Sequence, residues 1–218
     1  MPSIDLKDQY FGCEIEMTGL TRQQAAEAVA SLFGTTAVHS RSSRTYDPWE
    51  VTDNEGKTWR FVYDSSIHGS HRTGRQQIPI GDGDYKVEMN SPKLEYSEMG
   101  KLQEVVRTLR HAGAVVNGSC GMHVHVDASK HTPQSLKNAL SIMYSKEDIL
   151  FKALQVNESR ASRWCQKVRE PMLQKARKLS SEETKNLTQL EAIWYEGDNG
   201  STEHYRDRDH GPAAWACV

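Results

Sequence analysis

Two short stretches of the chain alternate apolar and polar residues, and this period of two predicts β-strands. Residues 11–17 alternate apolar side chains with the carboxylates of Glu14 and Glu16. Residues 122–126 alternate apolar side chains with two histidines, directly after a glycine-containing turn at 117–121. Because successive side chains of a strand point to opposite faces, each stretch has one apolar face and one face that carries paired polar groups.

Other stretches carry the signals of helices, hairpins and loops. Thr21 begins a capping-box pattern, which is typical of the start of a helix, and Gly34 is typical of a helix end. We therefore expect a helix between these two residues. The turn at 53–56 separates two stretches rich in aromatic and β-branched residues and predicts a hairpin over 45–63. The polar, glycine-rich residues 68–84 predict a mobile loop. Further strands are expected at 85–89 and 114–116, and further helices at 97–113, 132–154, 158–178 with an interruption at Pro171, and 180–194.

Strands dominate the first half of the chain and helices the second, and hairpin signals outnumber crossover connections. This order favours an α+β fold with a largely antiparallel sheet and helices packed on one side. A length of 218 residues suits one domain with a sizeable core. We expect that domain to span residues 1–200, followed by an irregular tail at 201–218.

Composition narrows the class of protein. With 27 basic and 29 acidic residues, the formal net charge is −2, so no overall positive charge indicates nucleic-acid binding. The sequence contains no apolar run of about 18 residues, so we expect no membrane span. The 4 cysteines lack C-x-x-C spacing, and the N-terminus lacks the basic and apolar regions of a signal peptide. We therefore expect a cytoplasmic protein with reduced thiols.

The histidine pair has two interpretations. His123 and His125 share one face of the predicted strand beside a glycine turn, which suits binding of a metal ion or a polyphosphate. The same pair also suits the polar face of a half-exposed strand that has no functional role. The H-x-H pattern alone leaves both interpretations open.

A second strand with paired ligands favours the metal interpretation. Glu14 and Glu16 carry like charges at neighbouring positions of one face, and their repulsion predicts that something cationic binds there. With Glu88 and His123 they form an oxygen-rich set that suits Mg²⁺ or Mn²⁺ better than structural Zn²⁺. Because Mg²⁺ commonly bridges carboxylates to phosphates, a nucleotide is the expected second partner. Glu88 taken by itself also suits a solvated strand position.

Positive charge for phosphate binding is available further along the chain. Arg160 and Arg163 lie three residues apart on one face of a predicted helix, and arginine binds phosphate through paired N–H groups. A solvated pair of helix arginines is the alternative interpretation. His125 would contact a phosphate if His123 binds the metal.

Five segments of the chain occur together in a characteristic order. They are FGCEIEMTG at 11–19, WRFVYDSS at 59–66, VEMNSP at 87–92, CGMHVHV at 120–126 and RWC at 163–165. Over about residues 10–200 this order resembles the putative amidoligase family, which is similar to the carboxylate–amine ligases of the glutamine synthetase and glutamate–cysteine ligase superfamily. The E-x-E strand and the G-x-H-V-H-V strand are specific in combination, whereas either alone is not.

The resemblance implies a glutamine synthetase catalytic-domain-like fold and an ATP-dependent ligase. A substrate carboxylate would be phosphorylated to an acyl phosphate, which the amine of a small molecule or peptide would attack to give an amide. By similarity, Glu14, Glu16 and Glu88 would hold Mg²⁺ or Mn²⁺ ions. His123 would complete a metal site.

The resemblance also implies roles for residues around the metals. His125 and Arg163 would lie near the nucleotide phosphates, and Arg160 or Arg163 would neutralise developing negative charge. Asp64 and Ser65 would lie at the edge of the site, near the substrate. Catalysis at such a site consists mainly of positioning and electrostatic stabilisation.

The chain departs from the family pattern near its end. The pattern continues into further strands with a Glu-Phe-Arg-like run, which would supply another ligand and a catalytic arginine. Residues 203–218 contain no such run, so the resemblance predicts a truncated C-terminus with an unpaired sheet edge, which bears on both stability and activity.

Two other functions compete with the ligase. A truncated, non-catalytic member would bind nucleotide or metal without turnover. An H-x-H hydrolase or oxygenase would use His123 and His125 as paired metal ligands. Residues 127–130 lack the Glu of a cupin-type site, and the E-x-E strand precedes the histidines, unlike the order in amidohydrolases. Mg²⁺-dependent nucleotide binding would separate the ligase from this last alternative.

Overall fold

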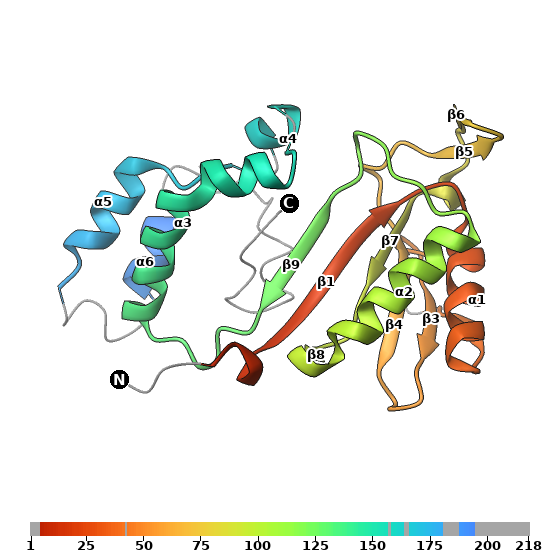
Figure 1. The fold of residues 1–218 in the computed structure, drawn as a ribbon, viewed down its shortest axis with the longest axis horizontal. Coiled ribbons are helices and arrows are strands. Elements are labelled where there is room, and N and C mark those ends of the chain that lie inside the picture. Colours follow the sequence, from red (N-terminus) through yellow and green to blue (C-terminus); the bar gives the residue numbers. More distant parts are fainter. Residues whose placement is uncertain (1–4, 42, 157, 164–165, 181–187, 195–218) are drawn as a thin grey trace. The chain divides into compact units, whose positions relative to one another are not determined.

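The structure is a computed structural model that describes residues 5–41, 43–156, 158–163, 166–180 and 188–194 (Figure 1). Contacts between Cα atoms divide the chain into two compact units. The sheet unit comprises Asp5–Val126, and the helical unit comprises Asp127–Val218 together with Met1–Ile4.

The sheet unit contains a seven-stranded antiparallel sheet with strand order β2-β3-β4-β7-β1-β8, in which β9 also pairs with β1. The α+β fold with a largely antiparallel sheet is therefore confirmed. Strand β1 pairs with both β7 and β9, so the two strands that carry paired polar residues are neighbours. The seven strands are β1 (Tyr10–Met17), β2 (Ala37–His39), β3 (Trp49–Thr52), β4 (Thr58–Tyr63), β7 (Val87–Asn90), β8 (Leu94–Glu95) and β9 (Met122–Val126).

Two α-helices of the sheet unit form close to where the sequence predicts them. Helix α1 (Arg22–Phe33) is capped by Thr21, whose hydroxyl accepts a 3.2 Å hydrogen bond from a backbone N–H of the first turn. It ends at Gly34, which has a left-handed φ of 66° that glycine adopts without steric cost. Helix α2 (Met99–Ala112) ends at the predicted Gly113. Short 3₁₀ helices are η1 (Leu6–Asp8), η2 (Gly83–Tyr85) and η3 (Tyr96–Glu98).

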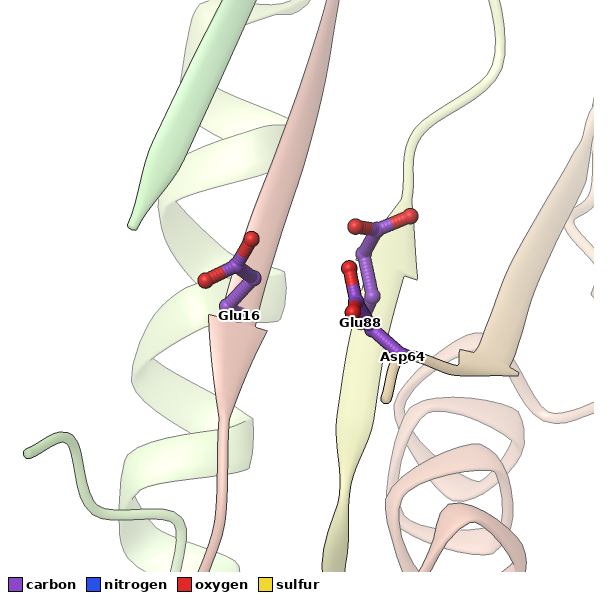
Figure 2. Close-up of side chains that lie close together, drawn as sticks. All are labelled: Glu16, Asp64 and Glu88. Atoms are coloured by element: carbon purple, nitrogen blue, oxygen red, sulfur yellow. The ribbon is translucent and has the colours of Figure 1, made fainter. Parts of the chain in front are cut away.

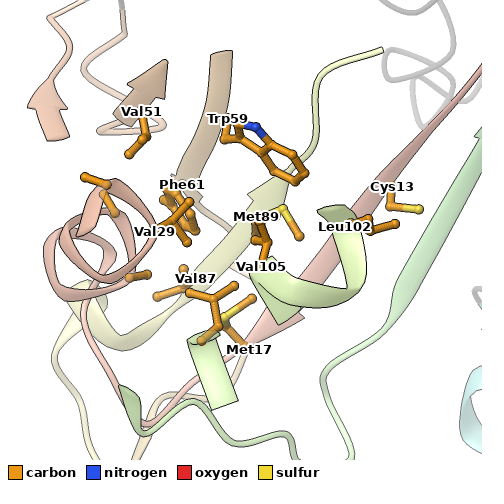
Figure 3. Close-up of a cluster of buried hydrophobic side chains, with 14 of the residues drawn as sticks. Cys13, Met17, Val29, Val51, Trp59, Phe61, Val87, Met89, Leu102 and Val105 are labelled. Carbon is orange, nitrogen blue, oxygen red and sulfur yellow. The ribbon is translucent and has the colours of Figure 1, made fainter. Parts of the chain in front are cut away.

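Both helices contribute to the apolar core on one face of the sheet (Figure 3). Trp59 and Phe61 of β4 and Met89 of β7 are fully buried in one cluster with Val29 of α1 and Val105 of α2. Burial of apolar surface is the dominant favourable contribution to folding, so this face accounts for most of the stability of the sheet unit. The polar side chains of the same strands point to the opposite face.

The prediction of a mobile loop at 68–84 is wrong, because strands β5 (Ser70–Thr73) and β6 (Gln76–Pro79) form a hairpin there. Neither strand alternates apolar and polar residues, so the local pattern carries no strand signal. A buried long-range contact holds the hairpin, in which the Thr18 hydroxyl donates to the Ser70 carbonyl at 2.8 Å and accepts from the Ser70 N–H at 2.7 Å. The predicted strand at 114–116 is reduced to an isolated bridge between Val115 and Thr18.

The helical unit has its own small apolar core. Its described helices are α3 (Pro133–Ala153), α4 (Glu158–Arg163), α5 (Glu170–Lys178) and α6 (Thr188–Trp194). Leu140 of α3, Leu173 of α5 and Leu190 of α6 are buried in one cluster. Every helix in the described ranges is too short or too polar to span a bilayer.

The helical stretch predicted over 158–178, with an interruption at Pro171, contains two helices, α4 and α5. Pro171 lies in the first turn of α5 and begins that helix instead of interrupting one. Proline suits the first turn because its fixed φ is already helical and its missing N–H has no partner there. The predicted last helix at 180–194 is described only over α6, because residues 181–187 lie outside the described ranges. Of the four cysteines, Cys13 and Cys120 form no disulfide, and the other two lie outside the described residues.

Candidate functional site

The pairing register gathers polar side chains of three neighbouring strands on the sheet face opposite the helices. Glu14 of β1 lies opposite Asn90 of β7 and opposite His123 of β9. Two residues further along β1, Glu16 lies opposite Glu88. Residues that are paired across neighbouring strands, and residues two apart on one strand, point to the same face of a sheet. The predicted ligands therefore belong to one surface.

Three carboxylates meet at one end of this surface (Figure 2). Glu16 comes from β1, Glu88 from β7, and Asp64 directly follows β4. Their side chains are buried, with exposed fractions of 5%, 8% and 5%, and each offers an oxygen within 4.8 Å of the others. Ionised carboxylates at this separation repel one another strongly, so a bound cation would stabilise the arrangement.

Backbone groups hold two of the three carboxylates in place. The Glu16 carboxylate accepts a 2.7 Å hydrogen bond from the N–H of Gly121, and the Glu16 N–H donates to the Gly121 carbonyl at 3.0 Å. The Asp64 carboxylate accepts a 2.7 Å hydrogen bond from the N–H of Ser66. The glycine turn that precedes the histidine strand therefore positions an acidic ligand of the neighbouring strand.

Glu14 lies between the two histidines of β9. Its carboxylate oxygens are 2.8 Å from Nδ1 of His123 and 3.2 Å from Nε2 of His125. Burial acts to raise the pKa of Glu14, but the hydrogen bonds and charges of the histidines outweigh burial and hold the pKa well below its usual range. Gly12 lies opposite His125 in the β1–β9 register. This Glu14–histidine cluster adjoins the three carboxylates through β1.

The structure brings together some of the predicted site residues. Glu16 and Glu88 meet each other, and Asp64, predicted for the substrate edge, lies with them as a third carboxylate. Glu14 and His123, both predicted as metal ligands, contact each other in the adjoining cluster. Their metal roles stay predictions.

Three further predicted site residues are Ser65, Arg160 and Arg163. Ser65 is exposed, and its carbonyl accepts a 3.3 Å hydrogen bond from the ammonium of Lys86. Arg160 and Arg163 belong to α4 in the helical unit, and their side chains lie outside the part of the chain that the structure describes.

Sequence reasoning missed the contact between the 117–121 turn and the loop after β4. The hydroxyl of Ser119 accepts a 2.8 Å hydrogen bond from the N–H of His68, and the side-chain amide of Asn117 donates to the His68 carbonyl at 2.8 Å. The Asn117 side-chain oxygen also accepts from the N–H of Ser119 at 2.9 Å, which orders the turn itself. The Asn-Gly-Ser run was a signal for a tight turn, but nothing local identified its partner.

The comparisons with known proteins identify a family. Residues 7–212 match the family model described as a putative amidoligase enzyme. A search of curated proteins finds no significant match, and a search of solved structures finds none either. The matched segment includes the E-x-E strand, Asp64, Glu88 and the histidine strand, and the family description indicates an amide-bond-forming ligase. The chain belongs to the putative amidoligase enzyme family.

Proposed function

We propose that the protein is an ATP- and Mg²⁺-dependent ligase that joins a carboxylate to an amine, each from a small molecule or a peptide. The observation that carries the proposal is the buried group of Glu16, Asp64 and Glu88, with oxygens within 4.8 Å of one another. A substrate carboxylate oxygen attacks the terminal phosphorus of ATP, ADP leaves, and an acyl phosphate forms. The amine then forms the C–N bond as the C–O bond to phosphate breaks, and inorganic phosphate leaves.

The donor set fits the proposed cation. Glu16, Asp64 and Glu88 offer hard, charged oxygen ligands, which Mg²⁺ and Mn²⁺ prefer to sulfur or nitrogen. Mg²⁺ bound there would neutralise the phosphate oxygens of ATP and hold them against the carboxylates. Glu14 and His123 would hold a second ion beside the first. Mn²⁺ would serve in place of Mg²⁺.

Other parts of the proposal concern residues around the cations. His125 would contact the nucleotide phosphates, and Arg160 or Arg163 would neutralise charge that develops during phosphoryl transfer. Ser65 would contact substrate at the rim. A glutamine synthetase-like fold belongs to the same proposal, and the antiparallel sheet, with the acidic strand β1 paired on both sides and helices on the opposite face, supports it.

Cation binding gives the first test. Calorimetric titration of the full chain with Mn²⁺ should show binding that Glu16→Gln and Asp64→Asn each weaken by about 10-fold or more. Glu104→Gln is the matched control, because Glu104 is an exposed residue of α2, which packs on the other face. A folded protein without Mn²⁺ affinity, or equal affinity in all variants, would contradict the proposed metal centre.

Turnover gives the second test and separates the competing functions. The ligase should release ADP only when Mg²⁺, a carboxylate and an amine are all present. Mg²⁺–ATP binding without ADP release under any combination would identify a non-catalytic binding protein. A tightly bound transition metal with no nucleotide affinity would instead support a hydrolase or oxygenase.

A further inference from the structure

We propose that His68 is the acid–base residue of this site and accepts the proton that the attacking amine loses. The proposal rests on the ligase function proposed above. It assigns a role to a side chain of the loop between Asp64 and the β5–β6 hairpin, where sequence reasoning placed only a mobile segment.

The loop after β4 keeps His68 close to the carboxylates. The N–H of Ile67 donates to the Asp64 carbonyl at 3.4 Å, which closes a turn from Asp64 to Ile67. Such a turn keeps its first and fourth Cα atoms within about 7 Å, and one more residue adds about 3.8 Å. The Cα atoms of Asp64 and His68 therefore lie within about 11 Å of each other.

The 117–121 turn fixes His68 from the other side. Its Ser119 hydroxyl and Asn117 amide bind the N–H and the carbonyl of His68, each at 2.8 Å. Two residues after Ser119, the N–H of Gly121 binds the Glu16 carboxylate at 2.7 Å. One short turn thus connects the backbone of His68 to a proposed metal ligand.

The side chain of His68 is exposed, while both of its backbone polar groups are held. A residue that transfers protons needs this combination, because its position must be fixed and its ring must reach the substrate. The backbone bonds fix the main chain of His68, and the exposure leaves its ring accessible to a substrate bound beside the carboxylates.

The proposed reaction needs a base at this point. An amine is largely protonated near neutral pH, and an ammonium has no lone pair for attack on the acyl phosphate. When the imidazole accepts one proton from the ammonium, the freed nitrogen lone pair forms the C–N bond and the C–O bond to phosphate breaks. Phosphate leaves with that electron pair and takes up the second proton that the nitrogen loses, so hydrogen phosphate and the neutral amide are the products. Imidazole is the side chain best suited to proton transfer near neutral pH.

Several charged or titratable groups lie on this loop and on the described segments packed against it. Asp64 lies on the loop itself, and Lys86 donates to its backbone at 3.3 Å. Asp82 belongs to the segment beside Gly69, and Cys120 belongs to the 117–121 turn. The Asp82 carboxylate accepts a 2.9 Å hydrogen bond from the N–H of Asp84, and Nδ1 of His71 on β5 is buried. With Asp64 assigned to the cation and Lys86 an ammonium, we assign the base to the exposed imidazole of His68.

A comparison of two nucleophiles, hydroxylamine and ammonium, tests the proposal on the full chain. Amino acids would first be screened as the carboxylate substrate with Mg²⁺–ATP and hydroxylamine. The amino acid that gives the highest hydroxamate yield would then be used with ammonium. Hydroxylamine is largely neutral near pH 7 and needs no base. His68→Gln should therefore keep hydroxamate formation but lose ammonium-dependent amide formation by about 100-fold or more at pH 7. Raising the pH should restore the amide rate, because free ammonia then accumulates.

The matched control is His111→Gln, which removes an exposed histidine of α2, the helix on the other face of the sheet. It should leave both rates at the wild-type level. If His68→Gln lowers both rates equally, or lowers neither, the assignment of His68 is overturned. Absence of hydroxamate from the wild-type protein with every acid would instead contradict the ligase function itself.

A second measurement does not depend on turnover. In NMR spectra, Mn²⁺ bound at the carboxylates should broaden the imidazole resonances of His68, identified by their loss in His68→Gln, and should affect those of His111 much less. Sharp His68 resonances in a protein that binds Mn²⁺ would overturn the proposal. A folded protein that binds no Mn²⁺ would contradict the metal centre first.

Discussion

The two faces of the main sheet are built from the same strands and have opposite roles. On β1, Cys13 lies in the apolar core, and burial raises the pKa of its thiol to about 11. The next residue, Glu14, points to the other face, where two histidines hold the pKa of its carboxyl well below the usual range despite burial. Adjacent residues of one strand therefore have opposite electrostatic environments.

This comparison separates stability from binding. The apolar face packs against α1 and α2 and contributes burial, whereas the polar face places like charges together at a cost to stability. A protein that keeps such a cluster gains from it only when a cation is present. Substitutions on the two faces should consequently differ in sign as well as in size.

The largest effect is expected on the apolar face. Phe61 is fully buried, and Phe61→Ala should lower the free energy of unfolding by about 3–5 kcal/mol through lost burial and a cavity. Denaturant unfolding of the metal-free protein measures this change. Phe61→Leu, which keeps most of the volume, should cost about 1 kcal/mol. Equal losses for the two variants would show that packing at this position does not determine stability.

A buried carboxylate outside the site should give the next largest effect and a pH dependence. Asp53 accepts hydrogen bonds from the Trp59 indole at 3.3 Å and from Lys101 at 3.2 Å. Burial acts to raise the pKa of Asp53. The hydrogen bonds from the backbone of Lys57 and Glu55 and from the side chains of Trp59 and Lys101 outweigh burial, so the pKa lies below its usual value. Asp53→Asn should cost about 2–3 kcal/mol near neutral pH.

The sign of the pH dependence follows from the lowered pKa of Asp53. The ionised carboxylate stabilises the fold above the unfolded value of about 4, and this contribution is lost as the pH falls through the folded pKa. The stability difference between wild type and Asp53→Asn should therefore shrink in acid. Denaturant unfolding at several pH values measures it, and a difference that grows on acidification would contradict this account.

On the polar face, removing a charge is expected to increase the stability of the metal-free protein. Glu88→Gln removes one charge from the three-carboxylate group and should raise the unfolding free energy of the chelator-treated protein by about 1 kcal/mol. Added Mn²⁺ should reverse the order, because the wild type then gains more from binding than the variant. Thermal unfolding with and without Mn²⁺ checks both parts. Destabilisation without metal would mean that Glu88 has a structural role.

The smallest effect is expected away from the carboxylate group on the same face. Arg60 pairs with Glu50 at 3.1 Å, but 60% of the Arg60 side chain is exposed. Arg60→Ala should change stability by less than about 1 kcal/mol and leave Mn²⁺ affinity unchanged. A large change in either quantity would extend the functional surface beyond the clusters described here.

Local patterns predict those elements whose signals lie within a few residues. Thr21 and Gly34 bound α1, and the turn at 53–56 joins β3 to β4, because capping and turn chemistry are local. The β5–β6 hairpin depends on Thr18, some fifty positions away, so no local pattern identifies it.

The site shows the same limit. Alternation places Glu14 and Glu16 on one face of β1, but only the pairing of Val62 with Glu88 puts Asp64, two residues beyond Val62, beside that carboxylate. The local sequence of each strand does not predict which distant strand it pairs with. Asp64 was therefore expected near the substrate, and its place among the carboxylates emerged only from the fold.

The end of the histidine strand has a mechanical consequence. Val126 is the last residue of the sheet unit, and the helical unit begins at the next residue, so β9 is also a tether. Among the described strands it is bonded only to β1, and a slip of one residue would exchange the histidines beside Glu14 for valines. The register of β9 on β1 therefore determines whether imidazoles or valines face Glu14.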